Sequence, residues 1–232
     1  MAGTLYVVAT PIGNLADMSE RAVKTLRDVA VVCAEDTRVS SKLLSAYDIV
    51  TPLESFHQHS SQRRTEYVIR RLEAGDDIAL VSDAGTPGIN DPGGMLIRDV
   101  VERVPDCRIV PVPGPNAAIA ALSVSGFPAD RYRYLGFVPL KKGRNTFFAD
   151  VAGIPETVVF YESKHRVLRT LSQLADAMDA AGTPERPVMA ARELTKQFET
   201  LYRGSARHVL AGVSDDRVLG EFVVVVGPRP KS

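Results

Sequence analysis

The chain is organised around the stretch Ser82-Asp83-Ala84-Gly85-Thr86-Pro87-Gly88-Ile89-Asn90-Asp91-Pro92-Gly93, which directly follows the apolar run Ile78-Ala79-Leu80-Val81. An apolar run that ends in a turn rich in glycine and proline is typical of a buried parallel strand whose carboxyl end opens onto a ligand site. Glycines let a bound molecule approach the backbone closely, and prolines limit how far the empty loop relaxes. A plain strand-to-helix connection is the alternative, but such connections are usually only about 2–6 residues long. The stretch therefore predicts a ligand-binding loop.

The same alternation of apolar runs and polar turns continues on both sides of this loop. Four further runs predict strands, at residues 4–9, 29–34, 52–56 and 108–112. Helices are expected between them, at 19–28, 40–46, 60–75 and 94–104. Ser19 stands where the N-cap of the first helix belongs. Strands that alternate with helices predict a mostly parallel sheet in a right-handed α/β domain.

Pro113-Gly114-Pro115-Asn116 interrupts this pattern, and the domain boundary is placed there. We expect an N-terminal α/β domain over 1–114 and a C-terminal α/β domain over 115–232. After a small-residue helix at 117–122, strands are expected at 132–138, 157–161, 188–191, 200–203 and 222–226, with helices at 165–181 and 205–211. Two strands in succession at 188–204 predict a mixed sheet in this second domain.

Composition and charge limit the class of protein. The chain has 45% hydrophobic and 24% charged residues, which describes an ordinary globular protein, and no apolar run approaches the roughly 18 residues that span a bilayer. The amino terminus leads straight into a strand, so a cytoplasmic protein without a membrane partner is expected. A formal net charge of zero argues against nucleic-acid binding by bulk attraction. Cys33 and Cys107 are expected to be buried free thiols.

Several common motifs are absent from the sequence. It contains no G-x-G-x-x-G opening a helix, no P-loop, no H-E-x-x-H and no paired C-x-x-C, which removes simple dinucleotide, P-loop and zinc sites from consideration. What remains are polar loops at the predicted carboxyl ends of strands, at Thr10–Asn14, Glu35–Arg38, His57–His59, Ser82–Gly93 and Pro113–Asn116. In an open α/β sheet these ends share one edge, so the loops are expected to converge on one crevice.

Motifs along nearly the whole chain carry a family resemblance. They are Ala9-Thr10-Pro11-Ile12-Gly13-Asn14-Leu15, Ala34-Glu35-Asp36-Thr37-Arg38, Ser82-Asp83-Ala84-Gly85-Thr86-Pro87 with Asp91-Pro92-Gly93, Pro113-Gly114-Pro115, Phe160-Tyr161-Glu162-Ser163 and Ala191-Arg192-Glu193-Leu194-Thr195-Lys196. Jointly they resemble the tetrapyrrole methylase superfamily of S-adenosylmethionine-dependent methyltransferases, in its ribosomal branch. The resemblance implies two α/β domains with the methyl donor between them, and a homodimer. It also implies methylation of the ribose 2′-hydroxyl of a cytidine in the decoding region of 16S rRNA, in the small ribosomal subunit.

The resemblance also assigns the residues that bind S-adenosylmethionine. They are Pro11, Ile12, Gly13, Ser82, Asp83, Gly85, Thr86, Pro87, Pro115, Asn116, Ala117, Tyr161 and Glu162. A zwitterionic amino acid needs backbone amides and carbonyls, and an adenine ring needs an apolar slot, which such loops supply. For Tyr161, placed near the adenosine, a core aromatic is the alternative.

A weakly acidic ribose hydroxyl benefits from a general base, and the candidates are Glu35, Asp36, His57 and Asp83. We expect the Glu35–Arg38 loop to perform the catalytic work, with a carboxylate of Glu35 or Asp36 accepting the proton and Arg38 holding a phosphate. The alternative is that Asp36 and Arg38 pair with each other and brace the loop.

A second informative stretch is basic and contains interleaved aromatic residues. It has five cations and no acid between 131 and 144, namely Arg131, Arg133, Lys141, Lys142 and Arg144. Cations beside aromatic rings suit phosphate neutralisation and base stacking, so these residues and His57 are predicted to contact RNA. An amphipathic strand with an exposed basic face, and a solvated histidine, are the alternatives.

Two departures from the family pattern are visible, and two other functions are kept open. Ser163-Lys164-His165 stands where the family usually has Ser-Pro-His, and many relatives continue into a small helical segment after the strand at 222–226. One alternative function is a tetrapyrrole C-methyltransferase of cobalamin or sirohaem synthesis. Those relatives resemble G-x-G-x-G-D at the first loop, where this chain has Thr10–Asn14. The other is a non-catalytic RNA-binding factor of ribosome assembly that keeps the donor pocket.

Overall fold

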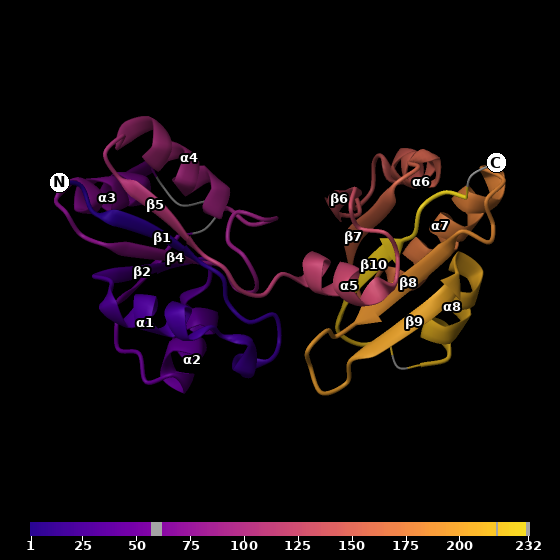
Figure 1. Cartoon of the computed structure of the whole chain (residues 1–232), viewed down its shortest axis with the longest axis horizontal. Coiled ribbons are helices and arrows are strands. Elements are labelled where there is room, and N and C mark those ends of the chain that lie inside the picture. Colours follow the sequence, from indigo (N-terminus) through magenta and orange to yellow (C-terminus); the bar gives the residue numbers. More distant parts are fainter. Residues whose placement is uncertain (57–61, 217, 231–232) are drawn as a thin grey trace. The chain divides into compact units, whose positions relative to one another are not determined.

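The computed structural model describes residues 1–56, 62–216 and 218–230. The chain forms two compact units, Met1–Asn116 and Ala117–Ser232, each with a sheet of its own (Figure 1). Each unit is described by itself. Within the described ranges, no helix is long and apolar enough to cross a membrane.

The N-terminal unit is built on a five-stranded parallel sheet with the order β3-β2-β4-β1-β5. The strands are β1 (Thr4–Val8), β2 (Val31–Ala34), β3 (Leu53–Ser55), β4 (Ile78–Val81) and β5 (Arg108–Val112). Every residue of β2 and β4 is buried, as expected for central strands covered on both faces. The predicted strands and their parallel arrangement are confirmed.

Helices cover both faces of this sheet, because side chains alternate along each strand. The helices are α1 (Glu20–Asp28), α2 (Thr37–Ala46), α3 (Gln62–Glu73) and α4 (Gly93–Arg103), with a short 3-10 turn at Leu15–Asp17. Leu80 packs with α3 and α4 on one face, and its neighbour Val81 packs with α1 and α2 on the other (Figure 1). The side chain of Ser19 accepts a hydrogen bond from the N–H of Ala22, which confirms it as the N-cap of α1.

The C-terminal unit has a mixed sheet with the order β6-β7-β10-β8-β9. Its strands are β6 (Tyr132–Phe137), β7 (Thr157–Ser163), β8 (Pro187–Arg192), β9 (Thr200–Ser205) and β10 (Glu221–Val226). β6 pairs in parallel with β7, whereas β7–β10, β10–β8 and β8–β9 are antiparallel. The predicted α/β fold class with a mixed second sheet is therefore confirmed.

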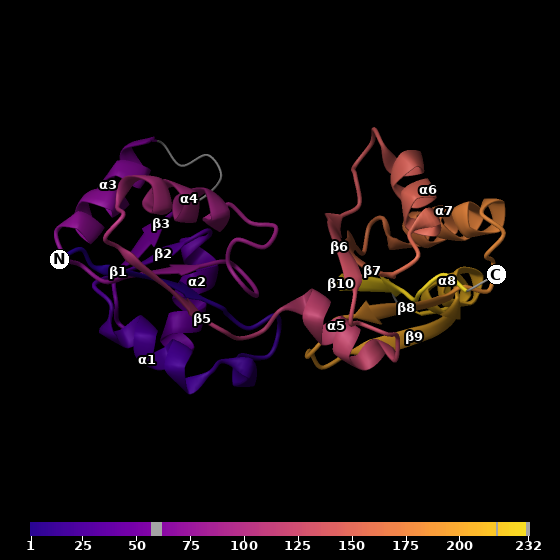
Figure 2. The ribbon, with the colours of Figure 1, turned by 45° about the horizontal axis from the view of Figure 1, so that its top comes forward.

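Three helices pack on one face of this sheet and one on the other. They are α6 (Arg144–Gly153), α7 (Val167–Ala180) and α8 (Ala206–Ser214), which share a core with Phe160 and Val224, and α5 (Ala117–Ser125), which contacts β7 and β10. Figure 2 shows α6 and α7 above the sheet and α5 below it. No helix was expected at 144–153, and that expectation is wrong. α6 begins after Gly143 without a side-chain cap, so it has no start signal.

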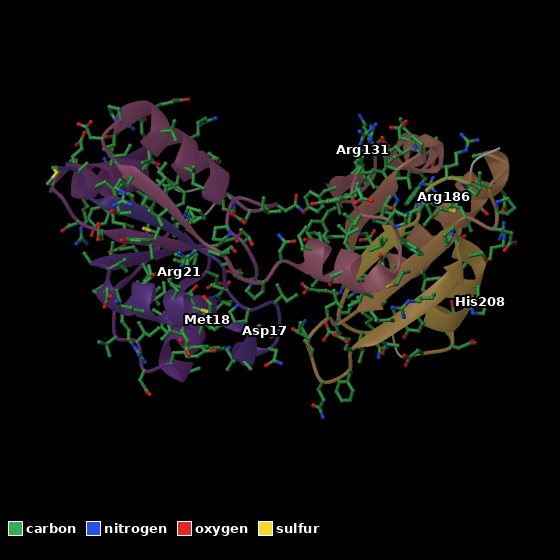
Figure 3. All side chains as sticks on the ribbon, in the orientation of Figure 1. Asp17, Met18, Arg21, Arg131, Arg186 and His208 are labelled. Atoms are coloured by element: carbon green, nitrogen blue, oxygen red, sulfur yellow. The ribbon has the colours of Figure 1, made fainter. Side chains whose placement is uncertain are left out.

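A fully buried arginine connects three backbone segments of this unit by hydrogen bonds. The guanidinium of Arg186, labelled in Figure 3, donates to the carbonyls of Gly227, Val151 and Glu156 at 2.7–3.0 Å, and to that of Ala152. Burial lowers the pKa of Arg186 to about 10. Buried carbonyl groups need hydrogen-bond donors, and the Arg186 side chain supplies them here. We therefore assign Arg186 a structural role.

Candidate functional site

The loops that follow the parallel strands of the N-terminal unit meet at one sheet edge. Thr10 after β1 and Gly85 after β4 form an isolated antiparallel bridge, with N–H···O distances of 2.9 and 3.0 Å in the two directions. The Thr10 hydroxyl also donates to the carbonyl of Ser82 at 3.2 Å. The bridge holds the first loop against the glycine-rich loop and confirms that these two loops converge.

The loop after β5 joins the same edge. Thr86 Oγ1 donates to the carbonyl of Pro115 at 3.2 Å. Gly85 has a φ of +84°, and a Cβ on it would lie 3.5 Å from the Ile12 side chain and 3.6 Å from the Pro115 carbonyl oxygen. Only glycine adopts this backbone conformation without strain, so the position requires it. Pro11, Ile12 and Gly13, and likewise Pro115 and Asn116, thus flank the predicted loop 82–87.

Two polar side chains of the glycine-rich loop serve the loop itself. Asp91 Oδ1 accepts the N–H groups of Gly88 and Gly93, each at 2.8 Å. The hydroxyl of Ser82 is buried and lies 3.3 Å from the carbonyls of Ala84 and Gly85. These contacts fix the loop conformation, whereas Asp83 is exposed and available to a ligand. Pro87 is buried, which leaves it a packing role.

Carboxylates gather where β2 and β4 end. Asp83 Oδ1 accepts the N–H of Asp36 at 2.9 Å, so the loop after β4 is bonded to the loop after β2. Partial burial, reinforced by the charges of Asp83, Asp91 and Asp36, raises the pKa of Glu35. Burial also raises the pKa of Asp83, with the charge of Asp36 adding to it. Both carboxyl groups therefore bind protons more readily than ordinary ones.

Asp36 and Arg38 pair with each other. Arg38 Nη2 lies 2.6 Å from Asp36 Oδ2, its Nε also donates to the carboxylate, and Asp36 caps α2 by accepting the N–H of Arg38. The hydrogen bonds from Arg38 lower the pKa of Asp36 to about 2. A carboxylate held in its ionised form is a weak base, so the prediction that Asp36 takes the proton is corrected: the bracing alternative describes this pair. Glu35 is left as the candidate base in this loop.

In the C-terminal unit, Tyr161 has the surroundings of a core aromatic, which was the alternative considered for it, and its place near the adenosine stays a prediction. Its ring lies edge-on to Tyr134 and Phe137, with centroids 5.4 and 5.3 Å away. Its hydroxyl accepts the N–H of Ala118, directly after the predicted site residue Ala117, at 3.1 Å. Desolvation by burial raises the pKa of Tyr161. It is thus a half-buried core aromatic whose hydroxyl binds the first turn of α5.

Two predicted site residues are instead inside this unit. The side chain of Glu162 is fully buried and accepts hydrogen bonds from Thr170 Oγ1 at 2.6 Å and the N–H of Ser163 at 2.7 Å. The side chain of Arg144 is 3% exposed and lies 3.7 Å from the same carboxylate. The Arg144 guanidinium is engaged in the interior and is not free to contact RNA, so that prediction is corrected. The buried Glu162 carboxylate cannot contact the adenosine, and only its backbone keeps the predicted place near it. Arg166, which ion-pairs with Glu162 at 2.7 Å, was missed.

The other predicted RNA contacts are at the surface where they are described. Arg131, Lys141 and Lys142 are exposed, and Figure 3 shows Arg131 close to β6. Arg133 is exposed but lies 3.4 Å from Glu156, so part of its charge is neutralised. His57 lies outside the described residues. Within the described residues, no group of three or more His, Cys, Asp or Glu side chains is arranged for a metal ion.

A model of the tetrapyrrole (corrin/porphyrin) methylases matches residues 4–210. The chain belongs to this family. It is 45% identical over 227 residues to ribosomal RNA small subunit methyltransferase I of Xylella fastidiosa, covering 97% of this chain and 81% of that protein. It is 47% identical over 228 residues to the protein of the same name from Pseudomonas aeruginosa, covering 97% and 79%. Within the family the chain therefore belongs with the ribosomal RNA small subunit methyltransferase I proteins.

Solved structures of the family share the fold. A cobalamin biosynthetic enzyme, cobalt precorrin-4 methyltransferase, superposes with a TM-score of 0.67 at 17% identity, covering 97% of this chain and 94% of that one. At this identity the likeness extends to architecture alone. Membership of a methylase family makes the chain a methyltransferase and implies a methyl donor, and the loops that meet at the N-terminal sheet edge are the place to look for its site.

Proposed function

We propose that the protein transfers a methyl group from S-adenosylmethionine to the ribose 2′-hydroxyl of a cytidine in the 16S rRNA of the small ribosomal subunit. The observation that carries the proposal is the 45–47% identity, over nearly the whole chain, to proteins named ribosomal RNA small subunit methyltransferase I. The tetrapyrrole alternative has weaker support, since the solved tetrapyrrole methyltransferases that match the chain are 17–19% identical. A homodimer and a cytoplasmic location stay predictions, and light scattering on the purified chain tests the first.

The residues at the N-terminal sheet edge fit such a donor. The loop 82–87 supplies backbone groups and a glycine that leaves room for close approach, with Thr10 and Thr86 fixing its shape. Asp83 supplies an exposed carboxylate for the positively charged ammonium and sulfonium groups. Pro11, Ile12 and Gly13 flank this loop as apolar neighbours. The assignments of Asn116, Ala117 and Tyr161 stay predictions.

The donor, when bound, supplies an electrophilic methyl group on a sulfonium. The ribose oxygen forms the new carbon–oxygen bond as the sulfur–carbon bond breaks, and the hydroxyl proton must leave. Glu35 is suited to accept it, because its raised pKa makes its carboxylate a stronger base than an ordinary glutamate. The first requirement is in-line placement of the reacting atoms about 3–3.5 Å apart. The Asp36–Arg38 pair holds the Glu35–Arg38 loop in position for this placement.

One assay separates the three functions. Labelled donor is incubated with the protein and small ribosomal subunits, free 16S rRNA or uroporphyrinogen. Label is expected in the rRNA, at a ribose that resists alkaline hydrolysis. Label in the porphyrinogen alone would favour the tetrapyrrole alternative. Donor binding without transfer to any of them would favour a non-catalytic assembly factor.

The role of Glu35 is tested by Glu35→Gln, with Glu73→Gln as the matched control. Glu73 is exposed and ends α3, at the opposite edge of the same sheet. Loss of a general base typically costs about 10²–10⁴-fold in rate, so Glu35→Gln is expected to bind the donor normally and lose that much transfer. Arg38→Ala is expected to lower transfer by releasing Asp36. Parental rates in both variants, with normal donor binding, would remove the loop from the mechanism.

A further inference from the structure

The C-terminal unit has its own loop-bearing sheet edge, at the carboxyl ends of β6 and β7. These strands are parallel, so the connection from β6 to α6 and the connection from β7 to α7 leave the sheet at the same edge. The N–H of Val138 donates to the carbonyl of Tyr161 at 3.3 Å, which keeps the two connections side by side. Figure 2 shows the connection between β6 and α6 extending away from the sheet.

A buried ion network fixes the base of both connections. Arg166 Nη1 donates to the carbonyl of Val138 at 3.1 Å, and Arg144 Nη1 donates to that of Pro139 at 3.0 Å. Both guanidiniums are anchored on Glu162, and Thr170 Oγ1 accepts from Arg144 and donates to Glu162. The Val138 carbonyl is therefore held from the second connection by Arg166, and the Pro139 carbonyl is held by Arg144, whose guanidinium contacts Glu162 and Thr170.

The residues beyond this clamp are positively charged. Segments 138–144 and 163–169 together contain Lys141, Lys142, Arg144, Lys164, Arg166 and Arg169, with His165 and no Asp or Glu. Lys141, Lys142, Lys164 and Arg169 are exposed. Two buried or half-buried arginines face a single buried carboxylate, so the network itself keeps one positive charge. Burial lowers the pKa of Arg144, and the positive charge of Arg169 lowers it further, so Arg169 acts on this network.

We propose that this two-loop edge, with Lys141, Lys142, Lys164 and Arg169, binds the phosphate backbone of the RNA substrate. The proposal rests on the proposed rRNA methylation and adds the surface that holds the substrate. Four exposed cations in two segments that contain no Asp or Glu suit a repeating phosphodiester, and they outnumber Glu221, the exposed acid that pairs with Ser163 across β10 and β7. Binding to an acidic protein would not give the linear dependence of log K on log salt concentration that the release of counterions from RNA produces. Lys164 is the residue that stands where the family usually has proline, so this chain has one more cation there.

The experiment measures binding of the full chain to small ribosomal subunits at several salt concentrations, with labelled-methyl transfer in parallel. Arg169→Gln is compared with Arg229→Gln. Both arginines are exposed in the same unit, but Arg229 follows β10, which runs antiparallel to β7 and places it at the opposite sheet edge. Lys141→Gln/Lys142→Gln tests the other loop. These positions are at the surface, so the variants are expected to fold.

Removal of a single cation that binds a phosphate reduces the steepness of the plot of log K against log salt concentration by about 0.7–0.9. We expect a reduction of about 0.7–0.9 for Arg169→Gln, about twice that for the double variant, and none for Arg229→Gln, with donor affinity unchanged. If the edge variants keep the parental slope while the parent binds and methylates rRNA, the proposed RNA-binding surface is wrong and the proposed function stands. A parent that neither binds nor methylates the subunit would overturn both.

Discussion

The substitution Glu162→Gln keeps the size of a fully buried side chain and removes its charge. The carboxylate accepts from Arg166 at 2.7 Å, Thr170 Oγ1 at 2.6 Å and the N–H of Ser163 at 2.7 Å, with Arg144 at 3.7 Å. Without it, two guanidiniums face each other in the interior with no counter-charge. Removing one partner of a buried pair costs about 3–5 kcal/mol. At about 4 °C per kcal/mol for a unit of this size, the midpoint of the C-terminal unit should fall by at least about 12 °C.

The measurement is thermal unfolding by far-UV circular dichroism, with hydrogen exchange of the β7 peptide to assign the transition to this unit. Glu185→Gln is the matched control, since Glu185 is exposed in the same unit and lies just before β8. A substitution at such a surface position changes stability by about 0.5 kcal/mol or less, so the control should shift the midpoint by about 2 °C or less. Similar small shifts in both variants would refute the network as the anchor of this edge.

Three other predictions follow from the N-terminal unit. Gly85→Ala should destabilise this unit by about 1–2 kcal/mol and weaken donor binding, because Gly85 has a φ of +84°. The control Gly153→Ala, at the end of α6, should cost nothing, and equal thermal unfolding midpoints for the two variants would contradict the prediction. The pKa of Glu35 is raised on folding, so its contribution to stability is lost as pH rises through the folded pKa. Glu35→Gln should therefore raise the unfolding midpoint at pH 8 but not near pH 4, and a lower midpoint at pH 8 would contradict it. Burial raises the pKa of Cys33 to about 12, so at pH 8 a thiol reagent should modify it only after unfolding. Peptide mapping distinguishes it from the half-buried Cys107, and rapid labelling of Cys33 in the folded chain would contradict this.

Local sequence signals were sufficient for the first sheet. Each central strand is a continuous apolar run, as at Ile78–Val81 before the glycine-rich loop 82–93. Such strands are buried on both faces, so composition alone identifies them. α6 had no comparable signal. It starts at Arg144, after Gly143 with a φ of +84° and no capping bond, inside a basic stretch typical of a surface loop.

The roles of individual charges in the candidate site were harder to predict, because they depend on distant partners. Arg144 belongs to a run of cations and was taken as a surface residue, but Glu162 and Thr170, 18 and 26 positions further along, draw it into the interior. Asp36 and Arg38 are two positions apart, so their pairing was a foreseeable alternative. The raised pKa of Glu35 comes first from burial and then from the charges of Asp83 and Asp91, 48 and 56 positions away, and no local sequence pattern contains those contacts.

The net charge of zero requires a different interpretation once the units are known. It argued against RNA binding by bulk attraction, yet charges act over about 10 Å at 0.1 M salt, so the local concentration of charge decides. One sheet edge in the N-terminal unit gathers Glu35, Asp83 and Asp91, which suits a cationic donor. Segments 138–144 and 163–169 of the C-terminal unit gather lysines and arginines around the buried Glu162 carboxylate, which suits a polyanion. The two proposed sites thus differ in local charge, as their two proposed ligands do, and the total charge carries no information about either.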